Sequence, residues 1–375
     1  MFRFPQPLAS PTKPTPSPPL SQPLCSIVPP FLLARIATIE DPRFERAADA
    51  AQRSLTDIAH DHLDHGRGEH SLPPRSLRNH EPSLRGTINR TIFDAQGTEV
   101  LPGIRVRAEG APATSDASVS EAYDGLGSTF ALFWEVFGRD SIDDRSAPLE
   151  ATVHYGKLYD NAFWDGRRMV FGDGDGEIFD GFTRSLSVIG HELAHGVTEY
   201  ASGLVYRDQS GALNEHLSDV FGVLVEQYAL GQAARDASWL VGEGIFTDQV
   251  EGNALRSMKA PGTAYDDDVL GKDPQPDHLD DYIVTQDDNG GVHLNSGIPN
   301  RAFWSVADTL GGYAWEHAGQ IWYDTLTGGS LTPHADFFEF AAATVESSIS
   351  RYGSGSAEHE AVRAGWSLVG IRPAE

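Results

Sequence analysis

Two histidines four residues apart, His191 and His195, constrain the fold of this chain more than any other feature of its sequence. On an α-helix, residues at this spacing share one face, with Cβ atoms about 6 Å apart. Two imidazoles so placed can hold one tetrahedral zinc ion, and Glu192 beside them is a candidate general base. A catalytic zinc site usually has three protein ligands and an open position for water. The pattern therefore predicts a helix packed against a second element that carries a ligand.

The third zinc ligand is predicted to be Glu215, on a second helix that faces the first. Asp219 lies four residues further on and faces the same site. From there its carboxylate can accept the spare N–H of a zinc-bound histidine, a contact that orients the ring.

A chance occurrence of the His-Glu-x-x-His string on an exposed helix is the alternative. An apolar stripe of helical period runs through the string and indicates a packed helix. The stripe consists of Leu186, Ile189, Leu193 and Val197. Burying two histidines and a glutamate is costly without a partner. The placement of Glu215 and Asp219 therefore favours a metal site over a chance match.

The spacing also separates classes of zinc hydrolase. The extended pattern with a third histidine is absent, because Thr198 and Ala201 stand at its glycine and histidine positions. Several longer strings carry a more specific resemblance, at residues 161–164, 169–176, 191–200, 203–206, 210–219, 254–258 and 288–297. On these strings the chain resembles the thermolysin-like neutral metallopeptidases. The resemblance implies hydrolysis of peptide bonds by a zinc-activated water, with Glu192 as the base.

The resemblance extends to residues beyond the zinc helix. Tyr206 and His293 match donors of hydrogen bonds to the developing oxyanion. Asp288 matches the carboxylate that orients His293 and stabilises its charge. Taken alone, His293 would be explained as an exposed loop residue, and only the surrounding 288–297 string favours the catalytic role.

Substrate contacts follow from the same resemblance. Asn161, the Ala162 backbone and Arg256 match groups that hold the peptide substrate. The pocket for the residue after the scissile bond is matched by Phe179, Phe182, Val188 and Leu255. All four are apolar, so we expect cleavage on the N-terminal side of bulky hydrophobic residues. Ordinary core packing explains each of the four equally well when it is taken singly.

Composition restricts the partners and the compartment. The 375 residues suffice for two lobes and an extension, and the formal charge of −26 disfavours nucleic acid and anionic membranes. No apolar run reaches the ~20 residues of a membrane span. The single cysteine, Cys25, excludes an intramolecular disulfide. Protein and peptide substrates are the expected partners, and the chain is expected to act as a monomer.

The N-terminal part predicts a removable segment. Residues 1–24 are Pro-rich and predict a disordered tail, and residues 25–62 predict a small helical pro-segment. Residues 63–86 are polar, contain several glycines and prolines, and predict a linker. The Ile-Val-Pro-Pro string at 27–30 resembles the pro-segment of the protealysin-like branch of the family. A small appended domain without inhibitory function is the alternative.

Two features of the pro-segment suggest how it would block the site. Pro29 and Pro30 restrict the backbone and resist cleavage. Cys25 could supply a thiolate to the open zinc position, because thiolates are strong zinc ligands. A neutral buried thiol is the commoner role of a cysteine and remains the alternative.

The body of the chain predicts an α+β fold of two lobes. Residues 87–202 alternate in the manner of a β-rich lobe and end in the zinc helix, with an inserted helix near 116–138. Residues 203–372 are mainly helical, with helices expected near 212–230, 296–310, 314–327 and 334–350. The two lobes are expected to meet at the zinc helix and to leave a substrate cleft there.

One zinc ion is the expected cofactor, and calcium is in doubt. The resemblance implies a paired calcium site, for which Glu226 and Glu243 supply carboxylates. The remaining positions are occupied by Ser187, Ser238 and Leu240. Because calcium takes six to eight oxygens, the paired site is expected to be degraded. A separate calcium site at Asp173, Asp175 or the acidic loop 266–268 is the remaining alternative.

Three functions compete on the sequence. The leading one is a secreted zinc endopeptidase made as a self-inhibited precursor, with export implied by the resemblance. A catalytically silent binding protein with this fold is disfavoured by the presence of Glu192, His293 and every zinc ligand. An intracellular, cytoplasmic protease is the third, since residues 1–30 hold ten prolines and no continuous apolar region of a signal peptide.

Overall fold

The computed structural model describes residues 25–66 and 84–372, with residues 57–66 described as backbone only. The expected tail, 1–24, and most of the expected linker, 63–86, lie outside the described residues. The N-terminal segment contains strand β1 (Cys25–Ser26), helix α1 (Pro30–Ile36), the 3-10 turn η1 (Pro42–Phe44) and helix α2 (Glu45–Gly66). Helix α2 passes the expected boundary at 62, because no glycine or proline interrupts it before Gly66.

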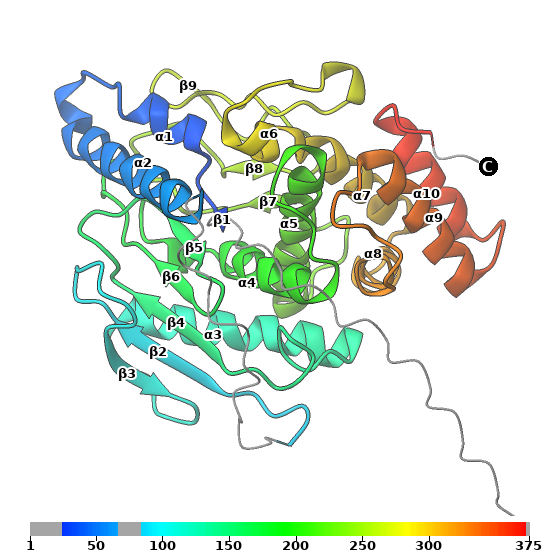
Figure 1. Ribbon diagram of the computed structural model, residues 1–375, viewed down its shortest axis with the longest axis horizontal. Coiled ribbons are helices and arrows are strands. Elements are labelled where there is room, and N and C mark those ends of the chain that lie inside the picture. Colours follow the sequence, from blue (N-terminus) through cyan, green and yellow to red (C-terminus); the bar gives the residue numbers. More distant parts are fainter. Residues whose placement is uncertain (1–24, 67–83, 373–375) are drawn as a thin grey trace, which may run out of the picture.

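A six-stranded sheet with the order β1-β5-β6-β4-β2-β3 forms the N-terminal lobe (Figure 1). Its remaining strands are β2 (Arg90–Asp94), β3 (Ile104–Ala108), β4 (Leu149–Val153), β5 (Ala162–Trp164) and β6 (Met169–Phe171). Strands β2, β4 and β6 run parallel, whereas β3 and β5 are antiparallel to their neighbours. Strand β1 pairs antiparallel with β5, with Cys25 opposite Trp164. The N-terminal segment thus completes the sheet of the lobe that follows it.

Helices flank this sheet and make up most of the second lobe. Helix α3 (Ala117–Ala131), its π-helical extension η2 (Leu132–Val136), the 3-10 turn η3 (Phe182–Arg184) and α4 (Leu186–Ala201) belong to the first lobe. The second contains α5 (Asp208–Leu230), α6 (Asp288–Asn295), α7 (Gly297–Leu310), α8 (Ala318–Thr327), α9 (Phe337–Tyr352) and α10 (Ala357–Leu368). Its short elements are β7 (Leu240–Val241), β8 (Arg256–Ser257), β9 (Asp266–Asp267), β10 (Gly271–Lys272) and η4 (Leu279–Asp281). Helix α10 was not among the helices expected from sequence. None of the described helices is both long and apolar enough to cross a membrane.

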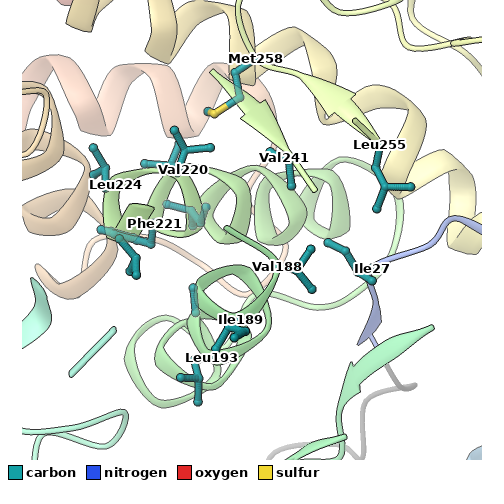
Figure 2. Close-up of a cluster of buried hydrophobic side chains, with 14 of the residues drawn as sticks. Ile27, Val188, Ile189, Leu193, Val220, Phe221, Leu224, Val241, Leu255 and Met258 are labelled. Atoms are coloured by element: carbon teal, nitrogen blue, oxygen red, sulfur yellow. The ribbon is translucent and has the colours of Figure 1, made fainter. Parts of the chain in front are cut away.

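The hydrophobic core joins the N-terminal segment to both lobes. Buried side chains of Ile27 and Val28, which follow β1, and of α1 and α2 belong to the same cluster as those of the sheet and of α4 and α5. In Figure 2, Ile27 points toward Val188 of α4 and Leu255, which precedes β8. Arg35 on α1 donates to the carbonyl oxygens of Asp268 and Val269, and Arg46 on α2 pairs with Glu177. The segment is therefore docked on both sides of the line where the lobes meet.

Helices α4 and α5 approach one another through glycines. A Cβ atom on Gly222 of α5 would lie 2.5 Å from the carbonyl oxygen of Ser187 and 2.9 Å from the backbone nitrogen of His191. A Cβ atom on Gly190 would lie 3.0 Å from the Gly222 Cα atom. Because no side chain separates the two backbones, a ligand on α5 can reach a metal held by α4.

A Gly222→Ala substitution is expected to separate these two helices. The added methyl group meets backbone atoms, which cannot rotate away, so we expect the free energy of unfolding to fall by about 1–3 kcal/mol and zinc binding to weaken. Chemical denaturation and zinc titration would measure the two effects. Gly196→Ala, whose methyl group meets the Trp164 side chain at 3.2 Å, is the milder control. Unchanged zinc affinity in Gly222→Ala would show that the close approach does not set the ligand geometry.

Candidate active site

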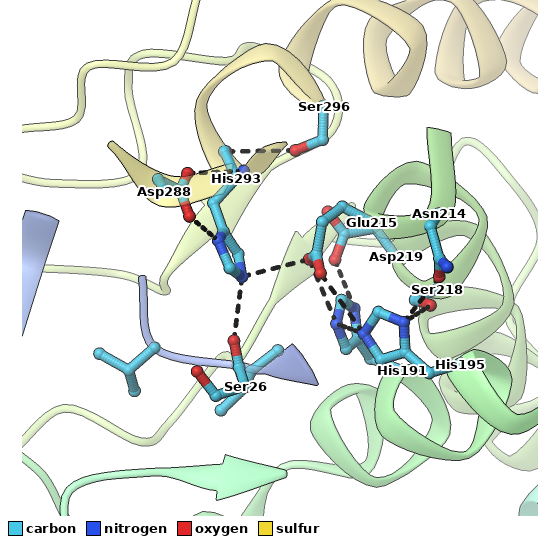
Figure 3. Close-up of polar contacts among 12 residues, drawn as sticks. Ser26, His191, His195, Asn214, Glu215, Ser218, Asp219, Asp288, His293 and Ser296 are labelled. Carbon is cyan, nitrogen blue, oxygen red and sulfur yellow. Dashed lines mark hydrogen bonds and ion pairs between the residues drawn. The ribbon is translucent and has the colours of Figure 1, made fainter. Parts of the chain in front are cut away.

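Three side chains from α4 and α5 converge on one point (Figure 3). The Nε2 atoms of His191 and His195 lie 3.0 Å apart, as the one-turn spacing predicts. Glu215 Oε2 lies 3.5 Å from His191 Nε2, and Glu215 Oε1 lies 3.5 Å from His195 Nε2. All three side chains are almost completely buried.

The protonation of the two imidazoles suits a metal ion. His191 Nδ1 donates to Asp219 at 2.7 Å, and His195 Nδ1 donates to the Asn214 amide oxygen at 2.8 Å. In the neutral rings the lone pairs are therefore on the two Nε2 atoms, which face each other. Burial lowers the pKa of His195 to about 4, so that its ring is neutral. Two lone pairs and a carboxylate facing one buried point repel each other unless a cation lies between them, so the donor set fits zinc.

The carboxylates around this point differ in their surroundings. Burial opposes the ionisation of Glu215, but the neighbouring histidines hold its pKa below its ordinary value. Burial also opposes the ionisation of Asp219, but Arg256 and His191 keep its pKa far below its ordinary value. Glu192 is fully buried, and neither of its carboxylate oxygens accepts a hydrogen bond from a described side chain. Burial and the charge of Glu215 raise the pKa of Glu192 well above its ordinary value.

His293 approaches the same point from the second lobe. Its Nδ1 atom donates to Asp288 at 2.6 Å, and its Nε2 atom donates to the Ser26 carbonyl oxygen at 3.0 Å. Both ring nitrogens face acceptors, which requires the charged imidazolium. Burial lowers the pKa of His293, but Asp288 and Glu215 outweigh it and raise the pKa to about 9.

A turn at the start of α6 brings the two residues together. Asn289, Gly290 and Gly291 have φ values of 51°, 90° and 78°, which fold Asp288 back toward His293. A Cβ atom on Gly290 would lie 2.1 Å from the Asp208 carboxylate, so this position requires glycine. The string that sequence alone would assign to an exposed loop is thereby held in the interior.

Tyr206 belongs to the same group. Its hydroxyl donates a short hydrogen bond to Glu215 and lies 3.4 Å from His293 Nε2. Burial and the charge of Glu215 raise its pKa well above the ordinary value. In this structure the phenol is neutral and its proton is directed to Glu215.

The residues matched to substrate contacts hold the N-terminal segment instead. The Ala162 carbonyl oxygen accepts a hydrogen bond of 3.0 Å from the Ile27 backbone nitrogen. The Asn161 amide oxygen accepts from the Val28 nitrogen, also at 3.0 Å. Arg256 donates to the Ile27 carbonyl oxygen at 3.0 Å. Main-chain groups of residues 26–28 thus take up the contacts expected for a peptide substrate.

The four matched pocket residues are all buried in one cluster. Val188 and Leu255 are turned toward Ile27 (Figure 2). Phe179 and Phe182 pack on each other with ring centroids 5.5 Å apart, and Phe179 also stacks on Phe246 at 5.4 Å.

Several orienting residues were missed at the sequence level. Asn214 and Ser218 both bind His195 Nδ1, at 2.8 and 3.0 Å. They lie four residues apart on α5, beside the Glu215 and Asp219 pair, so helical spacing could have identified them. Arg256, matched only to substrate, also donates to Asp219 at 2.8 Å. No local pattern predicts that ion pair, because 37 residues separate the two partners.

The fold and the buried histidine and carboxylate cluster define a two-lobed metallopeptidase. Residues 92–199 match the family model of the thermolysin metallopeptidase catalytic domain, and residues 202–371 match that of its alpha-helical domain. The chain belongs to the thermolysin metallopeptidase family.

Relatives and a solved structure agree with this assignment. An extracellular metalloprotease of Pectobacterium carotovorum subsp. carotovorum is 49% identical over 351 residues, 94% of this chain and 97% of that protein. Protease PrtS of a Photorhabdus species is 53% identical over 262 residues, 69% of this chain and 71% of that protein. The structure of the precursor of protealysin, a metalloproteinase from Serratia proteamaculans, matches with a TM-score of 0.83 and 49% identity, over 92% of this chain and 99% of that one.

The expected family, its protealysin-like branch and the α+β two-lobe fold are thereby confirmed. The chain is a zinc endopeptidase that is made as a precursor.

Proposed function

We propose that His191, His195 and Glu215 hold the single zinc ion with which this chain cleaves peptide bonds. The convergence of their three acceptor atoms supports the proposal, because both Nδ1 atoms are committed to outward hydrogen bonds. A bound zinc ion would polarise the scissile carbonyl and acidify an attacking water.

Glu192 is the proposed general base. It follows His191 directly, is fully buried, and has a pKa that burial and Glu215 raise. A carboxylate with a raised pKa takes up a proton more readily, as a base near neutral pH must. Glu192 would accept the proton of the water and return it to the leaving nitrogen.

His293 is the proposed donor to the developing oxyanion, with Asp288 keeping its ring charged. The Ser26 carbonyl oxygen occupies the acceptor position in front of Nε2. Tyr206 is the proposed second donor. Its proton would have to turn from Glu215 to the substrate oxygen once the N-terminal segment has left.

The binding mode of residues 26–28 supports the substrate assignments. A substrate would pair with β5 through Ala162 and Asn161, and Arg256 would bind the carbonyl after the cut. Ile27 then marks the residue after the scissile bond, in a pocket with Val188 and Leu255 and a wall that includes Phe179 and Phe182. The buried aliphatic side chain of Ile27 supports cleavage before bulky hydrophobic residues.

Self-inhibition by the N-terminal segment is the second part of the proposal. Strand β1 occupies the substrate edge of β5, and α1 and α2 anchor it to both lobes. Pro29 caps α1 and Pro30 is its first residue, so the chain leaves the cleft two residues after Ile27. Proline has no N–H with which to continue the strand pairing.

Cys25 lies where the thiol latch would require it. Its sulfur, one nitrogen of His195 and one oxygen of Glu215 all lie within 4.8 Å of one another. Burial, together with the charge of Glu215, raises the pKa of the thiol well above its ordinary value, which favours the neutral form. We therefore propose that main-chain and apolar contacts carry the inhibition, with a thiolate–zinc bond as the competing model.

The degraded paired calcium site remains a proposal. Ser187 accepts from the Gly242 backbone nitrogen at 3.1 Å, and burial, with Glu243 nearby, raises the pKa of Glu226. Protein groups also bind the alternative acidic positions. Asp173 pairs with His154, and Asp175 and Asp267 each accept several backbone N–H groups. Carboxylates used in this way support a chain that is active without calcium.

Export from the cell is proposed from the relatives, one of which is named an extracellular metalloprotease. Every side chain of the proposed site comes from this one chain, which supports action as a monomer.

Removal of the metal should abolish hydrolysis. The chain, trimmed within residues 67–83, should cleave peptides before Leu, Ile or Phe, lose activity with a zinc chelator, and regain it with one equivalent of zinc. Cleavage sites from mass spectrometry and metal content would be measured on the same sample. Undiminished hydrolysis by a sample shown to be free of metal would refute the zinc mechanism.

A further inference from the structure

A series of hydrogen-bonded side chains leads from Asp219, beside the proposed zinc ligands, into the helical lobe. The Trp322 indole nitrogen, on α8, donates to His216 Nε2 at 2.7 Å. His216 Nδ1 lies 2.8 Å from the Asn300 amide oxygen, on α7. The Asn300 amide nitrogen donates to Asp219 at 2.8 Å. All four side chains are fully or almost fully buried.

The direction of every hydrogen bond in this chain is determined by its ends. An indole nitrogen can only donate, so His216 Nε2 must accept and Nδ1 must carry the proton. An ionised carboxylate can only accept, so the Asn300 amide nitrogen faces Asp219 and its oxygen faces His216.

Asp219 is the point where this chain meets the site. One of its oxygens binds His191 Nδ1 at 2.7 Å and Arg256 Nη2 at 2.8 Å. The other binds Arg256 Nε at 3.0 Å and Asn300 at 2.8 Å. Asn300 therefore gives Asp219 a hydrogen bond in addition to those from His191 on α4 and from Arg256. Without it, the carboxylate can rotate and move His191 and Arg256 together.

We propose that His216 and Asn300, anchored by Trp322, are positioning residues that hold Asp219 at the angle required by His191 and Arg256. The inference rests on the proposed zinc site and adds to it the side chains that determine its ligand geometry. His216 directly follows the proposed ligand Glu215. One turn of α5 therefore carries both a zinc ligand and a residue of the hydrogen-bonded series that orients a second ligand, His191.

Two buried tryptophans provide a matched test. Trp322 and Trp366 are both fully buried, stack with ring centroids 6.1 Å apart, and each donates one hydrogen bond. Trp366 donates to Thr344 at 2.8 Å, outside the chain to Asp219. Trp322→Phe and Trp366→Phe thus remove the same atoms and one donor each. We expect similar losses in the melting temperature of the metal-free proteins.

The readout is the rate at which each full-length protein transfers zinc to a chromogenic chelator. Trp322→Phe should release zinc several-fold faster than the native chain, whereas Trp366→Phe should match it. Asn300→Leu, which removes the contact to Asp219 itself, should accelerate release by about ten- to a hundredfold. Equal release rates for the two tryptophan variants would overturn the proposal. Because zinc release is measured without substrate, this outcome is distinct from a failure of the native chain to hydrolyse peptides.

Discussion

Replacing Glu192 with alanine is expected to lower kcat by about a hundredfold to ten-thousandfold while one zinc ion per chain is retained. The proposed ligands His191, His195 and Glu215 do not depend on the Glu192 side chain for any described hydrogen bond. The proposed acceptor of the water proton, in contrast, is lost completely. Hydrolysis by the trimmed protein and metal content would be measured together.

Two further variants sharpen this test. Glu192→Gln keeps the shape of the side chain and should be as inactive as Glu192→Ala, because an amide cannot take up the proton. Glu199→Ala removes a carboxylate from the same helix outside the ligand set and should remain active. Full activity in a zinc-loaded Glu192→Ala protein would disprove the assignment of the base.

The intact chain is expected to be at least about tenfold less active than the chain trimmed within residues 67–83. A tethered segment has an effective concentration in the millimolar range, so an inhibition constant below ~0.1 mM keeps about nine-tenths of the sites blocked. The contacts of residues 26–28 with Ala162, Asn161 and Arg256 lie on the proposed substrate path. Rates of peptide cleavage by both forms, with the intact mass verified, would give the ratio.

Latency should also be released without any cut. Ile27→Asp places a charge in a fully buried apolar position, which is costly, so the segment should leave the cleft and the intact chain should become active. Ala34→Asp introduces the same charge on the exposed face of α1 and should remain latent. If the intact native chain cleaves peptides as fast as the trimmed one, the segment is not an inhibitor.

Cys25→Ser distinguishes the two models of inhibition within this test. Unchanged latency is expected, because the main-chain contacts and Ile27 persist in the variant. Activity of the intact Cys25→Ser chain would instead assign the inhibition to a thiolate–zinc bond.

The ligand helix could be deduced from sequence because its geometry is local. Residues four apart share a helical face, so the placement of His191 with His195 and of Glu215 with Asp219 follows from spacing alone. The apolar stripe around His191 likewise predicted that the helix is buried. Helix α10 was missed, and α2 proved longer than expected, because the ends of helices depend on capping and packing more than on composition.

The wider site depended on resemblance and on contacts between distant segments. Nothing local places Asn161 beside Val28, 133 residues away, or Arg256 beside Asp219. The turn that folds Asp288 onto His293 uses left-handed backbone at four successive residues, 288–291, which a Gly-rich string permits without requiring.

By itself the sequence predicted the ligand set and the base, and it determined the order of a β-rich part before a helical one, since these depend on residue type and on short-range periodicity. Only the tertiary structure decided that the N-terminal strand β1 pairs with the edge of β5 and that Trp322, His216 and Asn300 reach Asp219. Each of these contacts joins residues at least 81 positions apart, and the directions of the hydrogen bonds follow from which buried donors and acceptors are left to satisfy one another when the lobes pack.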